Sequence, residues 1–277
     1  MIQDIAPHVY QNMYRPEKPD RDSFILIYKE NHIFLKNTEE GIRFPTFREL
    51  ETENPDIYEN YTYLFAVDHN RFYYIKDVRC EQLPDFRWEP VQNFRKLKPQ
   101  YMAFAGITGS QLIRWYESRQ FCGRCGGRMQ QDTKERMVQC EACGLMEYPK
   151  ICPAVIVAVT DGSRILLSKY AGRAYKKYAL LAGFAEIGET IEETIRREVM
   201  EEVGLRVKNI RFYKSQPWSF SDTLLFGFYC DLDGDDRITL DEEELASAEW
   251  FERDDIPDME PDISLTREMI ERFKSGF

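Results

Sequence analysis

The sequence predicts a protein with an N-terminal β-rich region, a small zinc-binding module and a C-terminal α/β domain with a mixed sheet. Three observations support this prediction. Apolar segments in residues 1–118 are separated by turn-forming clusters, two C-x-x-C pairs follow, and strand-like and helix-like segments alternate in residues 149–277. We therefore divide the chain into regions 1–118, 119–148 and 149–277.

Residues 1–118 read mainly as strands joined by turns. "SFILIYKENHIFLK" and "YTYLFAVDHNRFYYIKD" are strand-like, while "KNTEEG" and "ETENPD" are turn-like. A helical pattern follows around "SQLIRWYESRQ". The region shows no catalytic constellation, and we interpret His32 and His69 as ordinary strand or turn residues.

Two cysteine pairs predict a zinc site. Cys122 with Cys125 and Cys140 with Cys143 form C-x-x-C motifs separated by fourteen residues. Two such knuckles joined by a polar hairpin are typical of a Cys₄ zinc ribbon, in which four thiolates complete the coordination and the metal is structural. A disulfide pair and a redox motif are the alternatives, and the expected compartment and the duplication disfavour them.

The ribbon is expected to stabilise the protein or support a dimer rather than to bind nucleic acid. Its cations are offset by neighbouring acids in the sequence. These cations are Arg124, Arg128, Lys134 and Arg136.

Residues 149–277 mix strand and helix patterns. "CPAVIVAVT" and "SRILLSKY" read as strands around the turn Asp161-Gly162. "YALLAGF" leads into a glutamate-rich helix, and further strands are predicted at "KNIRFYKSQPW" and "DTLLFGFYCDL", followed by "AEWFERDDIP". The tail "DISLTREMIERFKSG" reads as an amphipathic helix.

A second helix is predicted within "GFAEIGETIEETIRREVMEEVGL". Thr190 and Glu193 form a capping box, and Gly204 is the expected stop. Between them an apolar residue recurs at every fourth position. These residues are Ile191, Ile195, Val199 and Val203.

Three glutamates of this helix lie where charge is costly. By the helical repeat, Glu198 and Glu202 fall inside or beside the apolar stripe and Glu201 flanks it. Half-buried carboxylates are unfavourable unless they are neutralised, and convergent carboxylates are ligands for a hard divalent cation. Because the histidines lie in the first quarter of the chain, oxygen ligands favour Mg²⁺ or Mn²⁺ over zinc.

Composition narrows the classes of function. The net charge of −11 over 277 residues argues against non-specific binding to nucleic acid or anionic membrane. We expect no membrane span and no signal peptide, because the longest apolar run is "ICPAVIVAV" and the sequence starts "MIQDIAPHVY". Seven cysteines, of which four form a metal pattern, indicate a reducing cytoplasm.

The glutamate helix and the loop before it resemble the Nudix box, G-x5-E-x7-R-E-U-x-E-E-x-G-U with U apolar. Every fixed position matches. The matches are Gly183, Glu189, Arg197, Glu198, Val199, Glu201, Glu202, Gly204 and Leu205. The resemblance implies an α/β/α sandwich that hydrolyses nucleoside diphosphates linked to another group, using Mg²⁺ or Mn²⁺.

The chain as a whole resembles the NADH pyrophosphatase branch of this family. That branch combines an N-terminal β-rich domain, a Cys₄ zinc ribbon, a Nudix domain and the motif S-Q-P-W-P-F-P-x-S. The motif here is "SQPWSFSDT", in which Ser219 and Ser221 replace two prolines and Thr223 replaces the last serine. These departures do not change the reaction that we expect, but they weaken the inference that NAD(H) is the preferred substrate.

The resemblance implies roles for the matching residues. Glu198, Glu201 and Glu202 are implied metal ligands, and either Glu201 or Glu202 accepts the proton of the attacking water. Glu244 is the best match for a further ligand, with Glu243 as the alternative. Arg197 is implied to orient a neighbouring glutamate, with Glu189 as its loop partner, and contact with phosphate is the alternative.

Substrate contacts are implied for four further residues. Phe184 corresponds to a base-stacking residue, and Gln216 and Trp218 to nucleotide contacts. Core packing is the alternative for Phe184 and Trp218. Ser264, with Thr266, stands where the branch has a segment near the substrate.

The resemblance implies a cytoplasmic, homodimeric NAD(H) diphosphatase that releases AMP and nicotinamide mononucleotide. It also implies removal of NAD caps from RNA 5′ ends. One alternative is a Nudix hydrolase of ADP-ribose, diadenosine polyphosphates or another nucleoside diphosphate derivative. The other is a non-catalytic nucleotide-sensing or nucleic-acid-binding protein, which the intact box and the negative charge disfavour.

Overall fold

The computed structural model describes residues 1–172 and 177–276. The chain divides into two compact units. One unit comprises Ile2–Lys150 and Ser219–Ser221, and the other comprises Met1, Ile151–Trp218 and the chain from Asp222 onward. The unit that begins at Ile2 therefore contains both the β-rich region and the cysteine module.

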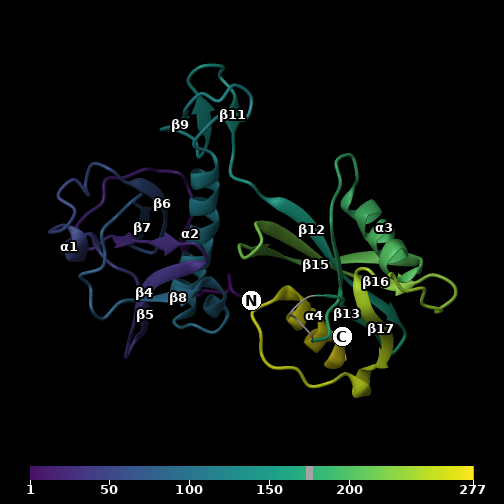
Figure 1. The fold of residues 1–277 in the computed structure, drawn as a ribbon. Helices are drawn as coiled ribbons and strands as arrows, with labels where there is room; N and C mark the ends of the chain where they lie inside the picture. Colours follow the sequence, from purple (N-terminus) through teal and green to yellow (C-terminus); the bar gives the residue numbers. More distant parts are fainter. Residues whose placement is uncertain (173–176, 277) are drawn as a thin grey trace. The chain divides into compact units, whose positions relative to one another are not determined.

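The β-rich region folds into two small sheets (Figure 1). The first has the order β1-β6-β7-β2, from strands Tyr10–Gln11, Thr62–Val67, Asn70–Tyr74 and Phe24–Ile25. The second has the order β3-β4-β5 with β8 also paired to β4, from strands Tyr28–Lys29, His32–Thr38, Gly41–Arg43 and Arg87–Pro90. The short helix α1 (Phe47–Leu50) and the 3₁₀ helix η1 (Val91–Arg95) connect the strands. The predicted strands are confirmed.

Helix α2 is longer than its sequence pattern predicts. It spans Gln100–Ser118, whereas the prediction begins near Ser110. The additional turns contain Gly106 and Gly109, which ordinarily weaken a helix. A Cβ on Gly106 would overlap the Phe94 ring, and one on Gly109 would overlap Leu26. These glycines therefore permit close packing of the helix and do not end it.

The cysteine module is a three-stranded ribbon with the order β11-β10-β9 in the described chain. Its strands are Met129–Gln131 (β9), Val138–Cys140 (β10) and Met146–Glu147 (β11). Several bonds join the β9–β10 hairpin to the β-rich region of the same unit. Tyr14 donates to the Asp132 carbonyl at 3.0 Å, and Gln131 donates to the Thr62 hydroxyl at 2.9 Å.

The other unit contains a mixed sheet with the order β15-β16-β12-β13-β17, and β14 pairs with β12. Its strands are Cys152–Asp161 (β12), Arg164–Tyr170 (β13), Leu181–Phe184 (β14), Val207–Trp218 (β15), Thr223–Leu232 (β16) and Leu245–Glu252 (β17). Strands β12 and β16 are parallel, and the other described pairings are antiparallel. The predicted mixed sheet is confirmed.

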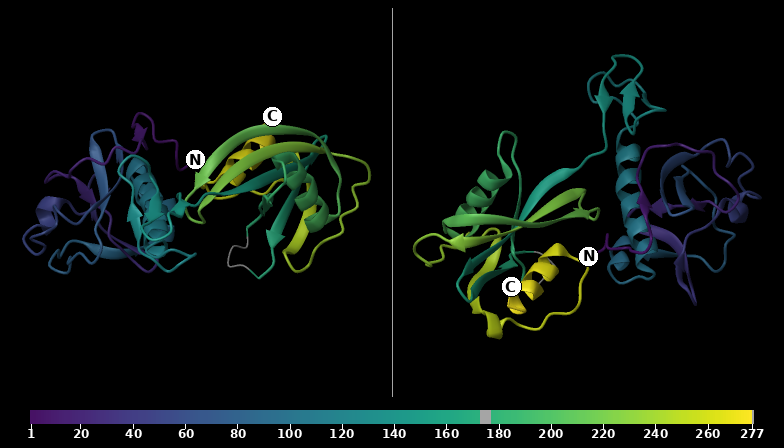
Figure 2. Two further views of the ribbon diagram at one scale, coloured as in Figure 1. Left: turned by 90° about the horizontal axis from the view of Figure 1, so that it is seen from above. Right: turned by 180° about the vertical axis from the view of Figure 1, so that it is seen from behind.

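Helices cover both faces of this sheet, giving an α/β/α sandwich (Figures 1 and 2). On β12, Val155, Val157 and Val159 pack on the face of α3 (Ile191–Val203). Ile156 and Ala158 pack on the face of α4 (Leu265–Lys274), which follows the 3₁₀ helix η2 (Arg253–Asp255). Because both faces are buried, β12 reads as a continuous apolar run in the sequence.

Helix α3 has the boundaries that its capping residues predict. Thr190 accepts a bond from the Glu193 N–H at 3.2 Å, and Gly204 ends the helix in the left-handed conformation with a φ of 70°. Ile195, Val199 and Val203 are fully buried. The helix is thereby fixed against the sheet and presents its glutamates at one edge of the core.

None of the helices within residues 1–172 and 177–276 has both the length and the apolarity needed to cross a membrane.

Candidate active site and zinc centre

Helix α3 holds two of its three central glutamates in the protein interior. Glu198 is 9% exposed and Glu202 is 2% exposed, whereas the side chain of Glu201 is 58% exposed. Two carboxylates at i and i+4 on the buried side of one helix repel each other and lose hydration. A bound cation would offset both costs.

Gly183 makes the room that Glu198 occupies. A Cβ at position 183 would overlap the carboxyl group of Glu198. Gly183 lies in β14, which faces α3 and pairs with β12 through Val155. Burial raises the pKa of Glu198, and the bond from Arg197 opposes that shift. The site therefore holds a carboxylate where its charge is poorly solvated.

Arg197 connects this helix to the loop that precedes it. Its Nη1 donates to Glu198 at 2.8 Å and to Glu201 at 2.9 Å. Its Nε and Nη2 donate to the two carboxylate oxygens of Glu189 at 2.6 and 2.9 Å, and Nη2 also donates to the Phe184 carbonyl at 2.9 Å. A planar guanidinium with donors in a fixed fork can fix several carboxylates at once.

Glu189 closes the loop over residues 185–190. It accepts from the Glu186 N–H at 3.1 Å and from the Thr194 hydroxyl at 2.9 Å, in addition to Arg197. The bonds from Arg197 are the main reason that its pKa falls to about 2. Gly188 adopts a φ of 96°, a conformation that favours glycine. The sequence analysis did not single out Thr194. The signal that could have identified it is a threonine directly after the capping-box residue Glu193.

Glu244 lies in the turn before β17 and is exposed. Its charge contributes to the raised pKa of Glu198, so the two carboxylates are near enough to repel. Its carbonyl accepts from the Ala171 N–H at 2.8 Å, which fixes the backbone of the turn. The backbone N–H of the neighbouring Glu243 donates to the Asp241 carboxylate at 2.9 Å. The electrostatic effect on Glu198 therefore favours Glu244 over Glu243.

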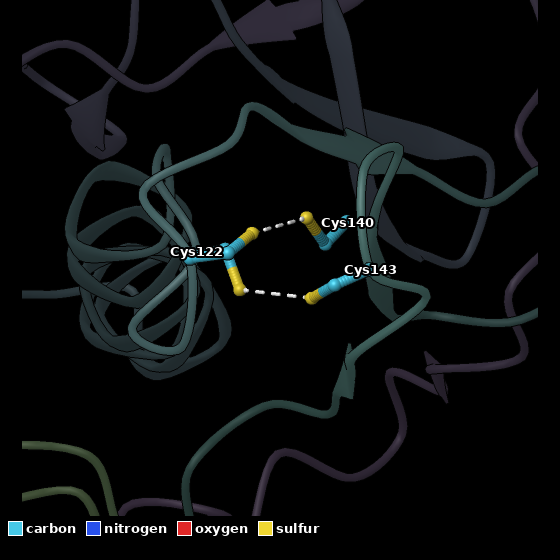
Figure 3. A group of neighbouring side chains, drawn as sticks. Cys122, Cys140 and Cys143 are labelled. Carbon is cyan, nitrogen blue, oxygen red and sulfur yellow. Dashed lines mark hydrogen bonds between the residues drawn. The ribbon is translucent and has the colours of Figure 1, made fainter.

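The four cysteines of the ribbon converge on one point (Figure 3). All four sulfur atoms lie within 4.8 Å of one another, with 3.6 Å between Cys122 and Cys143 and 3.5 Å between Cys125 and Cys140. Tetrahedral ligation with Zn–S bonds of about 2.3 Å requires sulfur atoms about 3.8 Å apart. The cysteines therefore fit a structural zinc ion.

Family models match two parts of the chain. The NUDIX domain model matches residues 150–273, and the NADH pyrophosphatase zinc ribbon domain model matches residues 117–148. A Pseudomonas aeruginosa protein named NAD-capped RNA hydrolase NudC is 37% identical over 193 residues, which cover 69% of each chain. The chain belongs to the Nudix family.

Other relatives of this Nudix protein match over a shorter length. A Haemophilus influenzae protein with the same name is 41% identical over 167 residues, which cover 58% of this chain and 62% of the relative. Among solved structures, a NUDIX hydrolase from Nitrosomonas europaea is 26% identical, covers 50% of this chain and 80% of its own, and has a TM-score of 0.44.

The Nudix glutamates suit a hard cation by the chemistry of their donors. They offer carboxylate oxygen, and no histidine lies in residues 149–277 of the sequence. The carboxylate oxygens of these glutamates lie farther apart than the sulfur atoms of the cysteines. Within the described residues, the four cysteines are the one group of His, Cys, Asp or Glu ligand atoms found within 4.8 Å of one another. The residues that the resemblance assigns to a divalent cation are Glu198, Glu201, Glu202 and Glu244.

Two aromatic residues assigned to substrate differ in exposure. Phe184 is 53% exposed at the end of β14, and its carbonyl is held by Arg197. The alternative of core packing therefore does not describe Phe184 in this structure. Trp218 is half-buried at the end of β15, where it pairs with Thr223.

Gln216 and Ser264 are linked through the backbone before α4. The Gln216 side chain is fully buried. Its Nε2 donates to the Ile263 carbonyl at 2.8 Å, and its Oε1 accepts from the Leu265 N–H at 2.7 Å. The Ser264 hydroxyl accepts from the Arg267 N–H at 3.3 Å and caps α4. Both side chains thus hold the start of α4.

Proposed function

We propose that this protein is a Mg²⁺- or Mn²⁺-dependent diphosphatase of NAD(H). The observation that carries the proposal is the Arg197 fork, which joins Glu189, Glu198 and Glu201 within an intact Nudix box. The names of the relatives and the match to the NADH pyrophosphatase ribbon model support the dinucleotide as substrate.

In this proposal Glu198, Glu201, Glu202 and Glu244 would hold the cation. When bound, the cation neutralises the charge of the diphosphate and lowers the pKa of water at the site. Either Glu201 or Glu202 accepts the proton of the attacking water, because a carboxylate is the base that the residues supply. Arg197 keeps Glu198 and Glu201 in position, and its own bonds to Glu189 prevent it from swinging away.

The reaction breaks one phosphorus–oxygen bond of the pyrophosphate. Water adds to one phosphorus, the bridging oxygen leaves with the other phosphoryl group, and the products are AMP and nicotinamide mononucleotide. The exposed ring of Phe184 is proposed to stack on a base of the substrate. The same cleavage on RNA with a 5′-terminal NAD would leave a 5′-monophosphate.

Gln216 is proposed to act on the substrate through the segment that it holds. Its amide is buried and bonded to Ile263 and Leu265, so it is suited to position Ser264 rather than to contact a nucleotide. Trp218 and Ser264 remain the proposed substrate contacts of this part of the site.

Cellular setting and assembly belong to the same proposal. Seven cysteines, four of them grouped as a zinc site, favour a reducing cytoplasm. A homodimer is proposed from the resemblance to the NADH pyrophosphatase branch.

A second candidate is hydrolysis of another nucleoside diphosphate derivative, such as ADP-ribose or a diadenosine polyphosphate. The altered motif favours this alternative, because Ser219 and Ser221 stand where the branch has prolines. Without the fixed φ of proline, the backbone of this segment has more freedom.

A competition assay tests the substrate. The protein would be incubated with Mn²⁺ and equimolar NADH, NAD⁺, ADP-ribose and diadenosine tetraphosphate, and the products followed by chromatography. We expect AMP to be released first from NADH or NAD⁺. Preference for ADP-ribose or the tetraphosphate would replace the proposed substrate with the second candidate, and no turnover of any of them would contradict both.

A further inference from the structure

The first zinc knuckle displays an exposed aromatic ring beside two arginines. We call residues Phe121–Arg128 the Phe121 knuckle. Phe121 is 56% exposed, and the Arg128 guanidinium lies 4.8 Å from the centre of its ring. The backbones of Phe121 and Arg128 form an isolated β-bridge, which keeps the two side chains together. Arg124 is exposed in the turn between them.

The cations of this knuckle are not neutralised by the neighbouring acids. Within the described residues, neither Arg124 nor Arg128 forms an ion pair with a carboxylate. The nearby acids are engaged elsewhere: Glu147 pairs with Arg119, Glu135 accepts from Tyr148 at 2.7 Å, and Asp132 caps the backbone of residues 134 and 135. Glu141 is exposed and its N–H donates to the Arg128 carbonyl at 3.3 Å, but among the described residues its carboxylate forms no ion pair with either arginine. Proximity in the sequence therefore overstated the neutralisation.

The knuckle is also open and stiff. A Cβ added to Gly123 or Gly126 would meet nothing within 4 Å, so the space beside these two glycines of the turn is open. Cys122 and Cys125 hold the same turn in the zinc site, and the Cys122 N–H bonds to the Gly127 carbonyl at 2.8 Å. A stiff surface loses little conformational freedom when it binds a partner.

We propose that the Phe121 knuckle binds single-stranded RNA. An aromatic face on which a base stacks, next to cations that contact the phosphates, is the arrangement by which proteins hold single strands without reading their sequence. A net charge of −11 repels RNA overall, so RNA binding requires a local site of unpaired cations. The inference rests on the proposed function, since it assigns the RNA beyond the cap to this surface.

The test compares two variants with matched charge. In the knuckle variant, Arg124→Gln and Arg128→Gln are combined with Phe121→Ala. In the control, Arg79→Gln and Arg237→Gln remove two exposed arginines that form no ion pair among the described residues. Zinc content is measured for both proteins to verify that the ribbon is intact.

Binding is measured with a fluorescent, uncapped single-stranded RNA over a range of salt concentrations. We expect the knuckle variant to raise the Kd about tenfold or more and to reduce the slope of log Kd against log salt by about one to two. The control should match the wild type in slope. An unchanged Kd and slope in the knuckle variant would overturn the proposal.

Turnover separates this proposal from the proposed function. The knuckle variant should hydrolyse free NADH at the wild-type rate and show a raised KM for NAD-capped RNA only. If the wild type hydrolyses neither substrate but binds RNA through the knuckle, the proposed function fails and the RNA surface stands. If sedimentation shows instead that the variant loses self-association and its RNA affinity is unchanged, the surface is an interface between copies of this chain.

Discussion

At the residue scale, Arg197 is the residue that the geometry makes most consequential. Its guanidinium bonds two carboxylates of its own helix, the carboxylate of Glu189 and the carbonyl of Phe184. A lysine would keep the charge but not the fork of donors, so it could not hold these groups together.

Arg197→Lys should therefore lower activity without unfolding the protein. We expect kcat/KM for NADH to fall about 10–100-fold, the loss typical when a group that orients metal ligands is changed. Steady-state kinetics over a range of Mn²⁺ concentrations would measure it. Arg196→Lys is the matched control, because Arg196 is exposed and its one hydrogen-bond partner among the described residues is a carbonyl of its own helix, that of Glu192. Equal losses in both variants would contradict the positioning role of Arg197.

The lowered pKa of Glu189 predicts how the stability of the protein changes at acidic pH. The bonds from Arg197 lower its pKa to about 2, so the carboxylate stabilises the folded state above its ordinary pKa near 4.5. That contribution is lost as the pH falls from about 4.5 toward 2. Unfolding by denaturant over this range should show a smaller dependence on pH in Glu189→Gln than in the wild type. An identical dependence in both proteins would show that the pair does not contribute.

The sequence predicted this group of residues but not all of its geometry. Helical periodicity places Glu198 and Glu202 in or beside the apolar stripe with Glu201 flanking it, and the resemblance to the Nudix box added Arg197. It did not reveal that Gly183 is a glycine because the Glu198 carboxyl occupies the space of its side chain. That contact joins residues far apart along the chain, and no local pattern encodes it.

At the scale of elements, several hydrogen bonds connect β15 to α4. Gln216 bonds the backbone on both sides of Ser264, and Tyr213 and Lys214 of β15 bond Glu268 of α4 at 2.7 and 2.5 Å. The "SQPW" segment thus fixes where α4 begins.

Gln216→Glu tests this connection. A carboxylate cannot donate to the Ile263 carbonyl, so the start of α4 should be released and a buried charge introduced. We expect the free energy of unfolding to fall by about 1–3 kcal/mol, which lowers the Tm. We also expect a raised KM with a smaller change in kcat. Pro217→Ala is an exposed neighbouring control. A raised KM with an unchanged Tm would instead indicate direct contact of Gln216 with substrate.

Elements were predicted best where local signals were complete. Helix α3 has a capping box, a four-residue apolar repeat and a terminal glycine, and its bounds agree with these signals. Helix α2 was predicted too short because Gly106 and Gly109 weaken the local pattern, and their packing against Phe94 and Leu26 is a tertiary property.

At the scale of the whole molecule, the zinc ribbon and the β-rich region form one compact unit. The sequence separated them at residue 118, since the cysteine motifs begin just after it. Bonds such as that from Tyr14 to the Asp132 carbonyl connect residues distant in sequence, which composition cannot reveal.

Removal of zinc should therefore destabilise the adjoining part of the β-rich region as well as the ribbon. Because structural zinc supplies much of the folding free energy of a small ribbon, chelation should unfold residues 119–148. We expect hydrogen exchange to speed up there, in β6 and in residues 12–14, which the ribbon contacts through Arg136, Gln131 and Asp132, while β12 and α3 stay protected. Cys143→Ser should give the same pattern without chelator. Uniform loss of protection in both units would contradict this division.

The central claim is that the buried glutamates of α3 catalyse hydrolysis of NAD(H), and Glu202→Gln tests it most directly. The wild type and the variant, matched in zinc content and in melting behaviour with Mn²⁺ absent, would be given NADH and Mn²⁺ and their products identified. We predict AMP and nicotinamide mononucleotide from the wild type, and a rate lower by about 100-fold or more in the variant. Equal rates in the two proteins, or no such products from the wild type, would contradict the claim.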